Sequence, residues 1–390
     1  MDKKVFYLGG ILTDEEVNYC IENSINYDMA ANNFQNKFIK GFKENNINIT
    51  CINVPFLSYH HLKKKNTVRI INDNNTNDEV DFYNYKYINS MFKYYALKKA
   101  IKNIDFSNSI IFSYSIHTPF LKILKHIKTN FNDVKVIQIV PDLPQYMNLT
   151  SKSKIIYSLL KKIEIFFIES LLKNVDFFVP FTRLMMDDFL QKYQKPFYVM
   201  EGVIDFKNEL TNTIKEDSNN FQVVYAGSLN KKYGVGKLIK AFEYINEENI
   251  KLKLCGNGDL VDFLENNKFK NIEYLGVLSP EQTTILINNA DLLINPREAN
   301  EKYTRYSFPS KLFEYMSSGN KILCFKLPSI PSDYFQFMYF FESNLEKDMA
   351  NEIVNTLYNK TNINLSKDFL LSKTAKCHIS NILMLATDKE

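Results

Sequence analysis

The chain has 390 residues, of which 45% are hydrophobic and 24% charged, so it is long enough for two globular domains and too apolar to be disordered. Its five cysteines are widely spaced and form no CxxC or Cys/His cluster, which argues against a zinc site and fits a reducing compartment. Basic residues exceed acidic ones in the first half of the chain only. This excess favours an anionic partner there, and a solvated basic face explains it equally well.

Short apolar runs alternate with amphipathic stretches in the first half. The segment KVFYLGG at 4–10 predicts a strand that ends in glycines, and NKFIKGFKENN at 36–46 predicts a helix. Further buried strands are expected at 47–55, 109–117, 134–144 and 175–182. The opening segment is too short and too soon polar for a signal peptide, and no apolar run of about 18 residues predicts a membrane-spanning helix.

After residue 220 the alternation starts again, with apolar runs at 221–229, 250–259, 271–278, 291–296 and 321–325 and helical patterns between them. Buried strands that alternate with helices indicate parallel βαβ units. The stretch 200–221 between the two series is polar and lacks apolar periodicity, so it predicts a linker. We therefore expect an α/β fold with two doubly wound domains at 1–203 and 204–368, and a C-terminal helix at 369–390 that packs back on the first domain.

The segment YSFPSKLFEYMSSG at 306–319 predicts a helix whose start can bind an anion. Pro309 fits the first turn, where its missing N–H costs nothing. Glu314 follows about one turn later, close enough to accept hydrogen bonds from ribose hydroxyls. A plain amphipathic helix, with Glu314 placed to suit the helix dipole, is the alternative. Backbone N–H groups without helical partners, which together with a lysine charge favour a phosphate, are expected at Ser310, Lys311 and Leu312.

Five motifs in order resemble the C-terminal half of retaining GT-B fold glycosyltransferases of the GT4 type, the glycosyl transferases group 1. They lie within 223–319 and read VVYAGSLNKKYGVGKLIKAF, LKLCGNGDL, IEYLGVLSPEQ, ADLLINP and SFPSKLFEYMSSG. The resemblance implies two Rossmann-like domains that face a cleft, with the nucleotide-sugar held mainly by the second. The first domain resembles the family more loosely.

The resemblance also implies where the donor binds. Gly227 and Ser228 would form the loop that approaches the diphosphate, Asn257 and Gly258 would lie near the nucleotide, and backbone groups of Val277 would contact the base. Glu314 matches the family's glutamate that binds ribose hydroxyls.

Two departures from the family's pattern leave questions open. The family often has arginine in place of Ser228 and a Lys-Gly pair at the position of Tyr233, so which cation meets the diphosphate stays open between Lys231 and Lys232. The family also carries a second glutamate where this chain has Tyr306. Side chains that could contact the sugar instead, or could belong to an ordinary loop, are Arg297, Glu298, Asn300 and Glu301.

Candidate residues of the first domain follow its strands. Gly9 and Gly10 let the backbone approach a ligand, with a tight turn as the alternative. His117, in SYSIHTP, resembles the family's histidine beside the reacting sugar, and we predict a catalytic role, with a structural hydrogen bond as the alternative. Asp142 in VPDLPQY is a second catalytic candidate, and capping of a turn between prolines is its alternative.

Two further stretches of the first domain point to an acceptor and to a surface. We expect AANNFQNKF at 30–38 to be a loop entering a helix, in which Asn33 and Gln35 face an acceptor. The segment 151–174 predicts a helix with lysines at 152, 154, 161, 162 and 173 among bulky apolar residues. It suits an anionic membrane surface, and a domain-packing helix with a wet basic edge is the alternative.

The resemblance implies a hexosyltransferase that moves a sugar, with retention, from a nucleotide-sugar to an acceptor. We expect a UDP-linked donor and a glycan or lipid-linked acceptor in cell-surface polysaccharide or lipid-linked oligosaccharide synthesis. No cofactor and no metal ion are expected, because no DxD-like motif is placed at a donor site and the resemblance implies a fold that works without a bound metal. We expect a cytoplasmic protein, which would lie at the inner face of the plasma membrane if the segment 151–174 binds there. We expect no nucleic-acid partner. A sugar-nucleotide epimerase of the same shape, a glycogen-synthase-like enzyme and a non-catalytic nucleotide-binding module remain alternatives.

Overall fold

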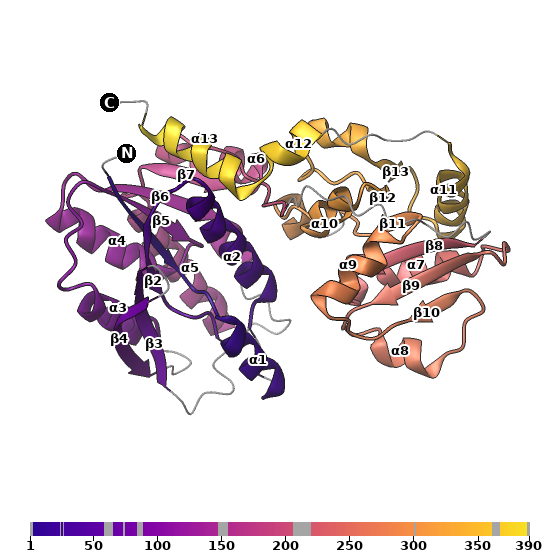
Figure 1. Ribbon diagram of the computed structural model, residues 1–390, viewed down its shortest axis with the longest axis horizontal. Coiled ribbons are helices and arrows are strands. Elements are labelled where there is room, and N and C mark those ends of the chain that lie inside the picture. The colour runs from indigo at the N-terminus through magenta and orange to yellow at the C-terminus, as the bar shows by residue number, and fades with distance from the viewer. Residues whose placement is uncertain are drawn as a thin grey trace. The chain divides into compact units, whose positions relative to one another are not determined.

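The computed structural model describes residues 3–23, 25, 27–57, 65–72, 75–83, 89–146, 155–205, 220–299, 302–360 and 367–387. The chain divides into two compact units, the first formed by Met1–Val203 with Lys373–Glu390 and the second by Ile204–Ser372. Each unit is built on one mainly parallel sheet with helices packed on it (Figure 1). The α/β class with two Rossmann-like domains is therefore confirmed.

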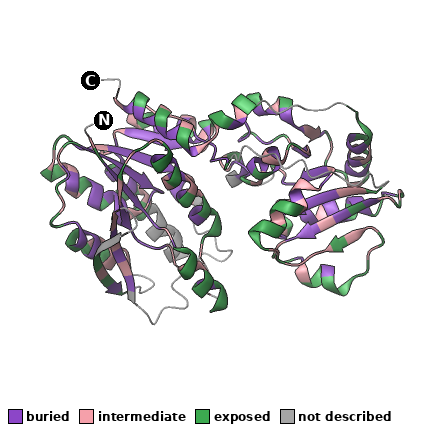
Figure 2. Cartoon of the chain, in the orientation of Figure 1, coloured by how far each residue is buried: buried purple, intermediate pink, exposed green. Residues whose placement is uncertain are grey.

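The sheet of the first unit has the strand order β4-β3-β2-β1-β5-β6-β7. All neighbouring strands are parallel except at β3, which runs antiparallel to both β2 and β4. Central strands such as β5 are buried along their whole length, because helices cover both faces of the sheet (Figure 2). The strands are β1 (Lys4–Gly9), β2 (Ile49–Asn53), β3 (Lys65–Asn72), β4 (Asn75–Tyr83), β5 (Ser109–Tyr114), β6 (Lys135–Val140) and β7 (Phe177–Pro180).

The β3–β4 hairpin corrects the expectation of parallel βαβ units throughout the first unit. Its strands include most of the Asn-rich tract 71–78, which has no apolar run to indicate a buried strand. The hairpin extends the sheet beyond β2, and on β3 the side chains of Val68 and Ile70 are buried while Arg69 between them is partly exposed. This alternation is that of a strand with one covered face.

Helices of the first unit include α2, which begins earlier than expected. Asp28 caps it, with its Oδ1 accepting a hydrogen bond from the N–H of Ala31 at 2.9 Å. Residues 30–38 therefore lie inside a helix, which corrects the predicted loop. The helices are α1 (Asp14–Glu22), α2 (Met29–Glu44), α3 (Asn89–Ala100), α4 (Thr118–Asn130), α5 (Ile155–Leu172), α6 (Arg183–Met185) and α13 (Ala375–Thr387).

The C-terminal helix α13 is part of the core of the first unit. Its buried residues Ala375, Ile379 and Ile382 share one apolar cluster with Tyr7 of β1 and Phe38 of α2. A side chain at Gly41 of α2 would collide with Ala375, so the glycine allows the two helices to pack closely. The last turns of the chain thus complete a domain that began with β1.

The sheet of the second unit has the strand order β10-β9-β8-β11-β12-β13, and all its neighbours are parallel. Apolar residues of its strands form a core with those of α7 and α11 on one face, and with those of α9 and α10 on the other. The strands are β8 (Phe221–Ala226), β9 (Ile250–Cys255), β10 (Ile272–Tyr274), β11 (Leu292–Asn295), β12 (Lys321–Phe325) and β13 (Tyr339–Phe341). The helices are α7 (Val235–Phe242), α8 (Val261–Asn266), α9 (Pro280–Asn288), α10 (Lys311–Ser318), α11 (Glu346–Tyr358) and α12 (Lys367–Ser372).

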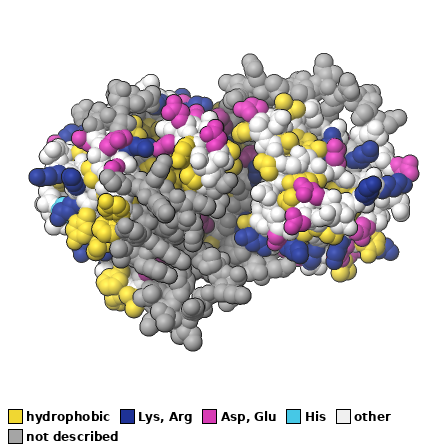
Figure 3. Space-filling view, turned by 90° about the horizontal axis from the view of Figure 1, so that it is seen from below, with side chains coloured by type: hydrophobic (Ala, Val, Ile, Leu, Met, Phe, Trp, Pro, Cys, Tyr) yellow, Lys and Arg dark blue, Asp and Glu magenta, His cyan; other side chains and the backbone are white. Residues whose placement is uncertain are grey.

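On the face that Figure 3 shows, the described residues of both units carry basic, acidic and apolar side chains intermixed. The expected linker 200–221 lies largely outside the described residues, since the description stops at 205 and resumes at 220. Within the described part of the chain, no helix is both long and apolar enough to cross a membrane.

Candidate functional site

The second unit has a topological switch point between β8 and β11. From β8 the chain builds the sheet outward through β9 and β10, and then returns to the other side of β8 with β11. In open parallel sheets, the loops that leave the carboxyl ends of the strands on either side of such a point form a ligand-binding crevice. Here those loops begin at Gly227 after β8, at Gly256 after β9 and at Pro296 after β11.

The loops after β8 and β9 pack backbone to backbone, which only glycine permits. Gly256 has a φ of +132°, and a Cβ on it would overlap the carbonyl oxygen of Gly227. A Cβ on Gly258 would overlap the backbone of Leu229 in the same way. The N–H of Leu229 donates to the carbonyl of Asn257 at 2.9 Å, so the two loops form one rigid rim.

Polar side chains fix the conformation of this rim. Asn230 accepts a hydrogen bond from the N–H of Asp259 at 3.0 Å and donates to the hydroxyl of Ser228 at 2.6 Å. Asp259 in turn accepts from the N–H of Lys231 at 2.8 Å. The hydroxyl of Ser228 is thereby held within the loop, and Asn257 lies exposed beside it.

Helix α10 begins beside the first loop. The nearest atoms to a Cβ on Gly227 would be the Tyr225 hydroxyl at 3.3 Å and Cε of Lys311 at 3.7 Å, so the Lys311 side chain reaches over this glycine. Pro309 is buried and Ser310 exposed at the helix start. The structure therefore brings the loop after β8 and the start of α10 together.

One backbone donor expected to be free is occupied. The N–H of Leu312 donates to the carbonyl of Pro309 at 2.9 Å, because the chain makes a tight turn before the helix. Within the described part of the chain, the N–H groups of Ser310 and Lys311 have no acceptor. An anion at this end of α10 can thus meet two backbone N–H groups, where three were expected, together with the ammonium group of Lys311.

Glu314 lies next to Lys311 on the first turn of α10. Its carboxylate is 2.9 Å from Nζ of Lys311, and the two side chains are 44% and 37% exposed, respectively. Burial raises the pKa of the Cys255 thiol at the end of β9, while Lys311 lowers that pKa and Glu314 raises it. Both charged groups are therefore near enough to the carboxyl end of β9 to affect this thiol.

The segment after β11 contributes a buried arginine and a paired glutamate. Arg297 is 8% exposed, with its guanidinium carbon 5.8 Å from the centre of the Tyr233 ring. Glu298 is 2.8 Å from Nζ of Lys237 and accepts a hydrogen bond from Asn344 at 3.1 Å. Glu298 is therefore held by structural partners, whereas the guanidinium of Arg297 lies at the rim that carries Tyr233.

The remaining residues implied for the donor lie around these loops. Lys231 and Lys232 are exposed in a short helical turn, Nζ of Lys232 being 5.0 Å from the Tyr233 ring centre. Val277 is 72% exposed, and the carbonyl of Gly276 before it accepts from the N–H of Gly256 at 2.9 Å. Asn300 and Glu301 lie outside the described residues.

Two tyrosines that the sequence does not single out position the loop after β8. The Tyr315 hydroxyl, fully buried, accepts a hydrogen bond from the N–H of Ala226 at 3.1 Å. The Tyr225 hydroxyl donates to the carbonyl of Ser228 at 2.8 Å. Burial raises the pKa of both hydroxyls, so both are neutral and able to donate. Both tyrosines stand among apolar residues in the sequence and therefore look like core residues. Only the position of Tyr315 directly after Glu314 could have suggested a role near the site.

In the first unit, the glycine loop after β1 is filled by a side chain. Gln35 is fully buried, accepts a hydrogen bond from the N–H of Gly10 at 2.9 Å and donates to its carbonyl at 3.2 Å. A Cβ on Gly9 would overlap the amide of Gln35, so the glycines make room for this glutamine. Gln35 thus supports the loop and does not face an acceptor, which corrects the expectation drawn from the predicted loop.

His117 lies at the carboxyl edge of the first sheet, directly before α4. Its ring is half-buried between two phenylalanines, 4.9 Å from the centre of the Phe56 ring and 5.6 Å from that of Phe120. Phe56 also covers Gly10, where a Cβ would overlap its ring. His117 and the glycine loop are therefore neighbours across one aromatic side chain.

Asp142 and Asn33 occupy more open positions in the first unit. Asp142 is exposed after β6 and is one of the charges that, after burial itself, raise the pKa of the Tyr114 hydroxyl. Asn33 is exposed on α2 and lines a cavity of about 530 Å³. Thr13, Asp14, Asn36 and Lys37 share that cavity. Among the described residues, no group of three or more His, Cys, Asp or Glu is placed to hold a metal ion.

Comparison with known proteins identifies the fold and the second unit. Residues 206–369 match the family model of the glycosyl transferases group 1. A lipopolysaccharide outer core galactosyltransferase, WaaB, has a similar structure at 13% identity and a TM-score of 0.60, with 99% of this chain and 100% of that one covered. No curated protein matches the chain.

Two further solved structures show the same likeness. Starch synthase IV from Arabidopsis thaliana, bound to ADP and acarbose, is 10% identical with a TM-score of 0.60 over 100% of this chain and 99% of that one. A variant of TarM from S. aureus, in complex with UDP, is 13% identical with a TM-score of 0.55 over 98% and 100%. The chain therefore has the fold of these glycosyltransferases, the GT-B fold, and its second unit matches the family model of the glycosyl transferases group 1 over residues 206–369.

Proposed function

We propose that the chain transfers a sugar from a nucleotide-sugar donor to a glycan acceptor, with retention at the anomeric carbon. One observation carries the assignment of the donor to the second unit. Lys311 reaches over Gly227 at the open start of α10, with Glu314 2.9 Å from its ammonium group. A cation, two free backbone donors and a carboxylate are what a diphosphate and its ribose hydroxyls require.

The arrangement accounts for how the leaving group would be stabilised. As the sugar departs, negative charge develops on the diphosphate, and the N–H groups of Ser310 and Lys311 with the helix dipole oppose it. The ion pair of Lys311 with Glu314 is partly exposed and therefore weak, so it opens at little cost. Lys311 can then turn to the phosphate while the carboxylate accepts ribose hydroxyls. These groups supply the positive charge without a metal ion, and we propose no cofactor.

The partners of the reaction follow from the likeness to known structures. The solved relatives contain UDP in one case and ADP in the other, and we propose UDP for this chain. WaaB is described as acting on the outer core of lipopolysaccharide, which supports a cell-surface glycan or its lipid-linked precursor as the acceptor. We place the reaction in the cytoplasm, where nucleotide-sugars serve as donors and the five free cysteines stay reduced.

A two-step measurement tests the proposal. In the first step, UDP and ADP are added separately to the protein in the presence of a chelator, and the melting temperature is recorded. A nucleotide that binds only the folded state stabilises it by RT ln(1 + L/Kd), where L is its free concentration, and so raises the melting temperature. In the second step, a panel of nucleotide-sugars is incubated with the protein and the release of nucleoside diphosphate is followed by mass spectrometry. Absence of both protection and release for every nucleotide would refute the proposed donor site.

A further inference from the structure

In residues 163–172, the part of helix α5 whose side chains the structure describes, the helix has two apolar faces, and only one of them packs against the protein. Ile168, Leu171 and Leu172 are buried. Ile163, Phe166 and Phe167 are 46%, 71% and 54% exposed. Their spacing of three and four residues places these three on one side of the helix. A folded first unit therefore keeps an apolar stripe in water, which marks an interaction surface.

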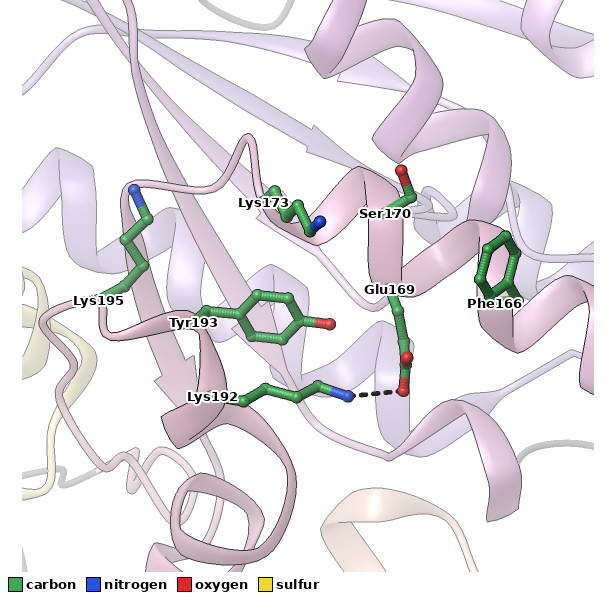
Figure 4. Close-up of a pocket in the computed structure, with 7 residues that line it drawn as sticks. All are labelled: Phe166, Glu169, Ser170, Lys173, Lys192, Tyr193 and Lys195. Carbon is green, nitrogen blue, oxygen red and sulfur yellow. Dashed lines mark hydrogen bonds and ion pairs between the residues drawn. The ribbon is translucent and has the colours of Figure 1, made fainter.

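Lysines stand beside this stripe. Lys173, Lys192 and Lys195 line a cavity of about 420 Å³ that Phe166 borders, as Figure 4 shows. Its only acidic side chain, Glu169, is 2.6 Å from Nζ of Lys192, and both side chains are about half exposed. The cavity therefore has an excess of positive charge next to exposed aromatic rings.

We propose that this surface docks on an anionic lipid membrane. The α5 docking face consists of Ile163, Phe166, Phe167, Lys173, Lys192 and Lys195. Its apolar side chains enter the boundary between headgroups and acyl chains, and its lysines bind phosphate groups of the lipids. The long lysine stems let the ammonium groups stay at headgroup level while the rings lie deeper.

The size and charge of the face favour a membrane over a protein partner. A stable protein interface buries about 1,200–2,000 Å² in total, far more than three protruding side chains provide. A bilayer needs only a few inserted apolar side chains together with basic ones, because the lipid adapts to their shape. The lysines of 151–162 add to the sequence charge of this segment, but their side chains lie outside the described residues.

The inference does not depend on the donor site and is tested without any nucleotide. The protein is sedimented with vesicles of phosphatidylcholine containing about one third phosphatidylglycerol, and with pure phosphatidylcholine vesicles, at low and high salt. We expect binding to the anionic vesicles only, weakened by salt because exposed charges are screened. Each lysine near an anionic surface contributes about fivefold to the partition constant, so Lys173→Gln with Lys195→Gln should lower it roughly 30-fold.

Matched variants separate the face from general effects of charge and hydrophobicity. Phe166→Ser with Phe167→Ser should lower the partition constant at least about tenfold, since two exposed rings no longer enter the bilayer. The controls, Tyr95→Ser with a 59% exposed ring on α3 and Lys99→Gln on the same helix, should bind as the unaltered chain does.

Three results would overturn the proposal. They are absence of binding to the anionic vesicles at low salt, unchanged binding of the Phe166 and Phe167 variant, and an equal loss in the controls. If the unaltered chain instead forms a dimer in size-exclusion chromatography, and the Phe166 and Phe167 variant is monomeric without any vesicle binding, the face is an interface between copies. Melting temperatures of the variants verify that each remains folded.

Discussion

Replacing Glu314 by glutamine tests the donor site most directly. The ion pair of Glu314 with Lys311 is partly exposed on both sides, so its loss should change the stability of the fold by less than about 1 kcal/mol. A hydrogen bond from a ribose hydroxyl to the carboxylate is worth about 1.5–3 kcal/mol. Glu314→Gln should therefore weaken nucleoside diphosphate binding roughly 10- to 150-fold, as measured by isothermal titration calorimetry.

Inorganic pyrophosphate distinguishes the two roles that the site assigns to Glu314 and Lys311. Pyrophosphate has no ribose, and the substitution frees Lys311 from its carboxylate partner. The affinity for pyrophosphate should therefore stay constant or rise in Glu314→Gln, while the affinity for UDP falls. The matched control is Glu248→Gln, which removes an exposed carboxylate 2.7 Å from Lys270 on the same unit. Unchanged UDP affinity in the folded Glu314 variant, or an equal loss of UDP and pyrophosphate binding, would refute the ribose contact.

Three other predictions concern turnover, the loop rim and pH. His117→Ala should lower turnover strongly with little change in nucleoside diphosphate affinity. His126→Ala, on the helix α4 that follows His117, should change neither, and full turnover of the folded His117 variant would refute the catalytic role. Gly256→Ala should cost at least about 2 kcal/mol of unfolding free energy in denaturant titrations, because its Cβ would overlap Gly227, while Gly236→Ala, with no atom within 4 Å, should be neutral or stabilising. Burial lowers the pKa of His378 to about 3 from 6.5, so only the unfolded state gains a proton as the pH falls below 6.5. Stability should drop by about 2 kcal/mol between pH 7 and pH 5, and His378→Asn should flatten this slope.

The sequence predicts well those elements whose signal is local. The run at 109–114 is apolar on both faces of the strand, and all of β5 is buried. In the second unit, the apolar runs that are followed by Gly227, Gly256 and Pro296 correspond to β8, β9 and β11, the strands whose carboxyl ends carry the loops of the switch point. The start of α10 is similarly visible, because proline, serine and lysine precede the apolar positions of the helix.

Elements that depend on distant partners are not visible in the same way. The β3–β4 hairpin has a polar sequence, because one of its faces is uncovered. Gln35 has the sequence of a surface residue, and only the fold shows that its side-chain amide hydrogen-bonds to both the N–H and the carbonyl of Gly10. From the sequence, Glu298 could contact a sugar, but in the structure its carboxylate forms an ion pair with Lys237 and accepts a hydrogen bond from Asn344. The N–H of Leu312, expected to be free, donates to the carbonyl of Pro309 in a turn that no residue pattern indicates.

Both units have glycine in the loop after a central strand, β1 in the first unit and β8 in the second, but the glycines have different roles. In the first unit, the space over Gly9 and Gly10 is filled from within by Gln35 and Phe56, so a ligand phosphate finds neither room nor free donors at this loop. In the second unit, the space over Gly227 is bounded by a tyrosine hydroxyl and by the stem of Lys311. A glycine pair after the first strand is therefore no evidence for a phosphate site by itself. The side chain next to the missing Cβ distinguishes the two loops, because it completes the core in the first unit and brings a positive charge in the second. On this ground we propose that the second unit binds the diphosphate.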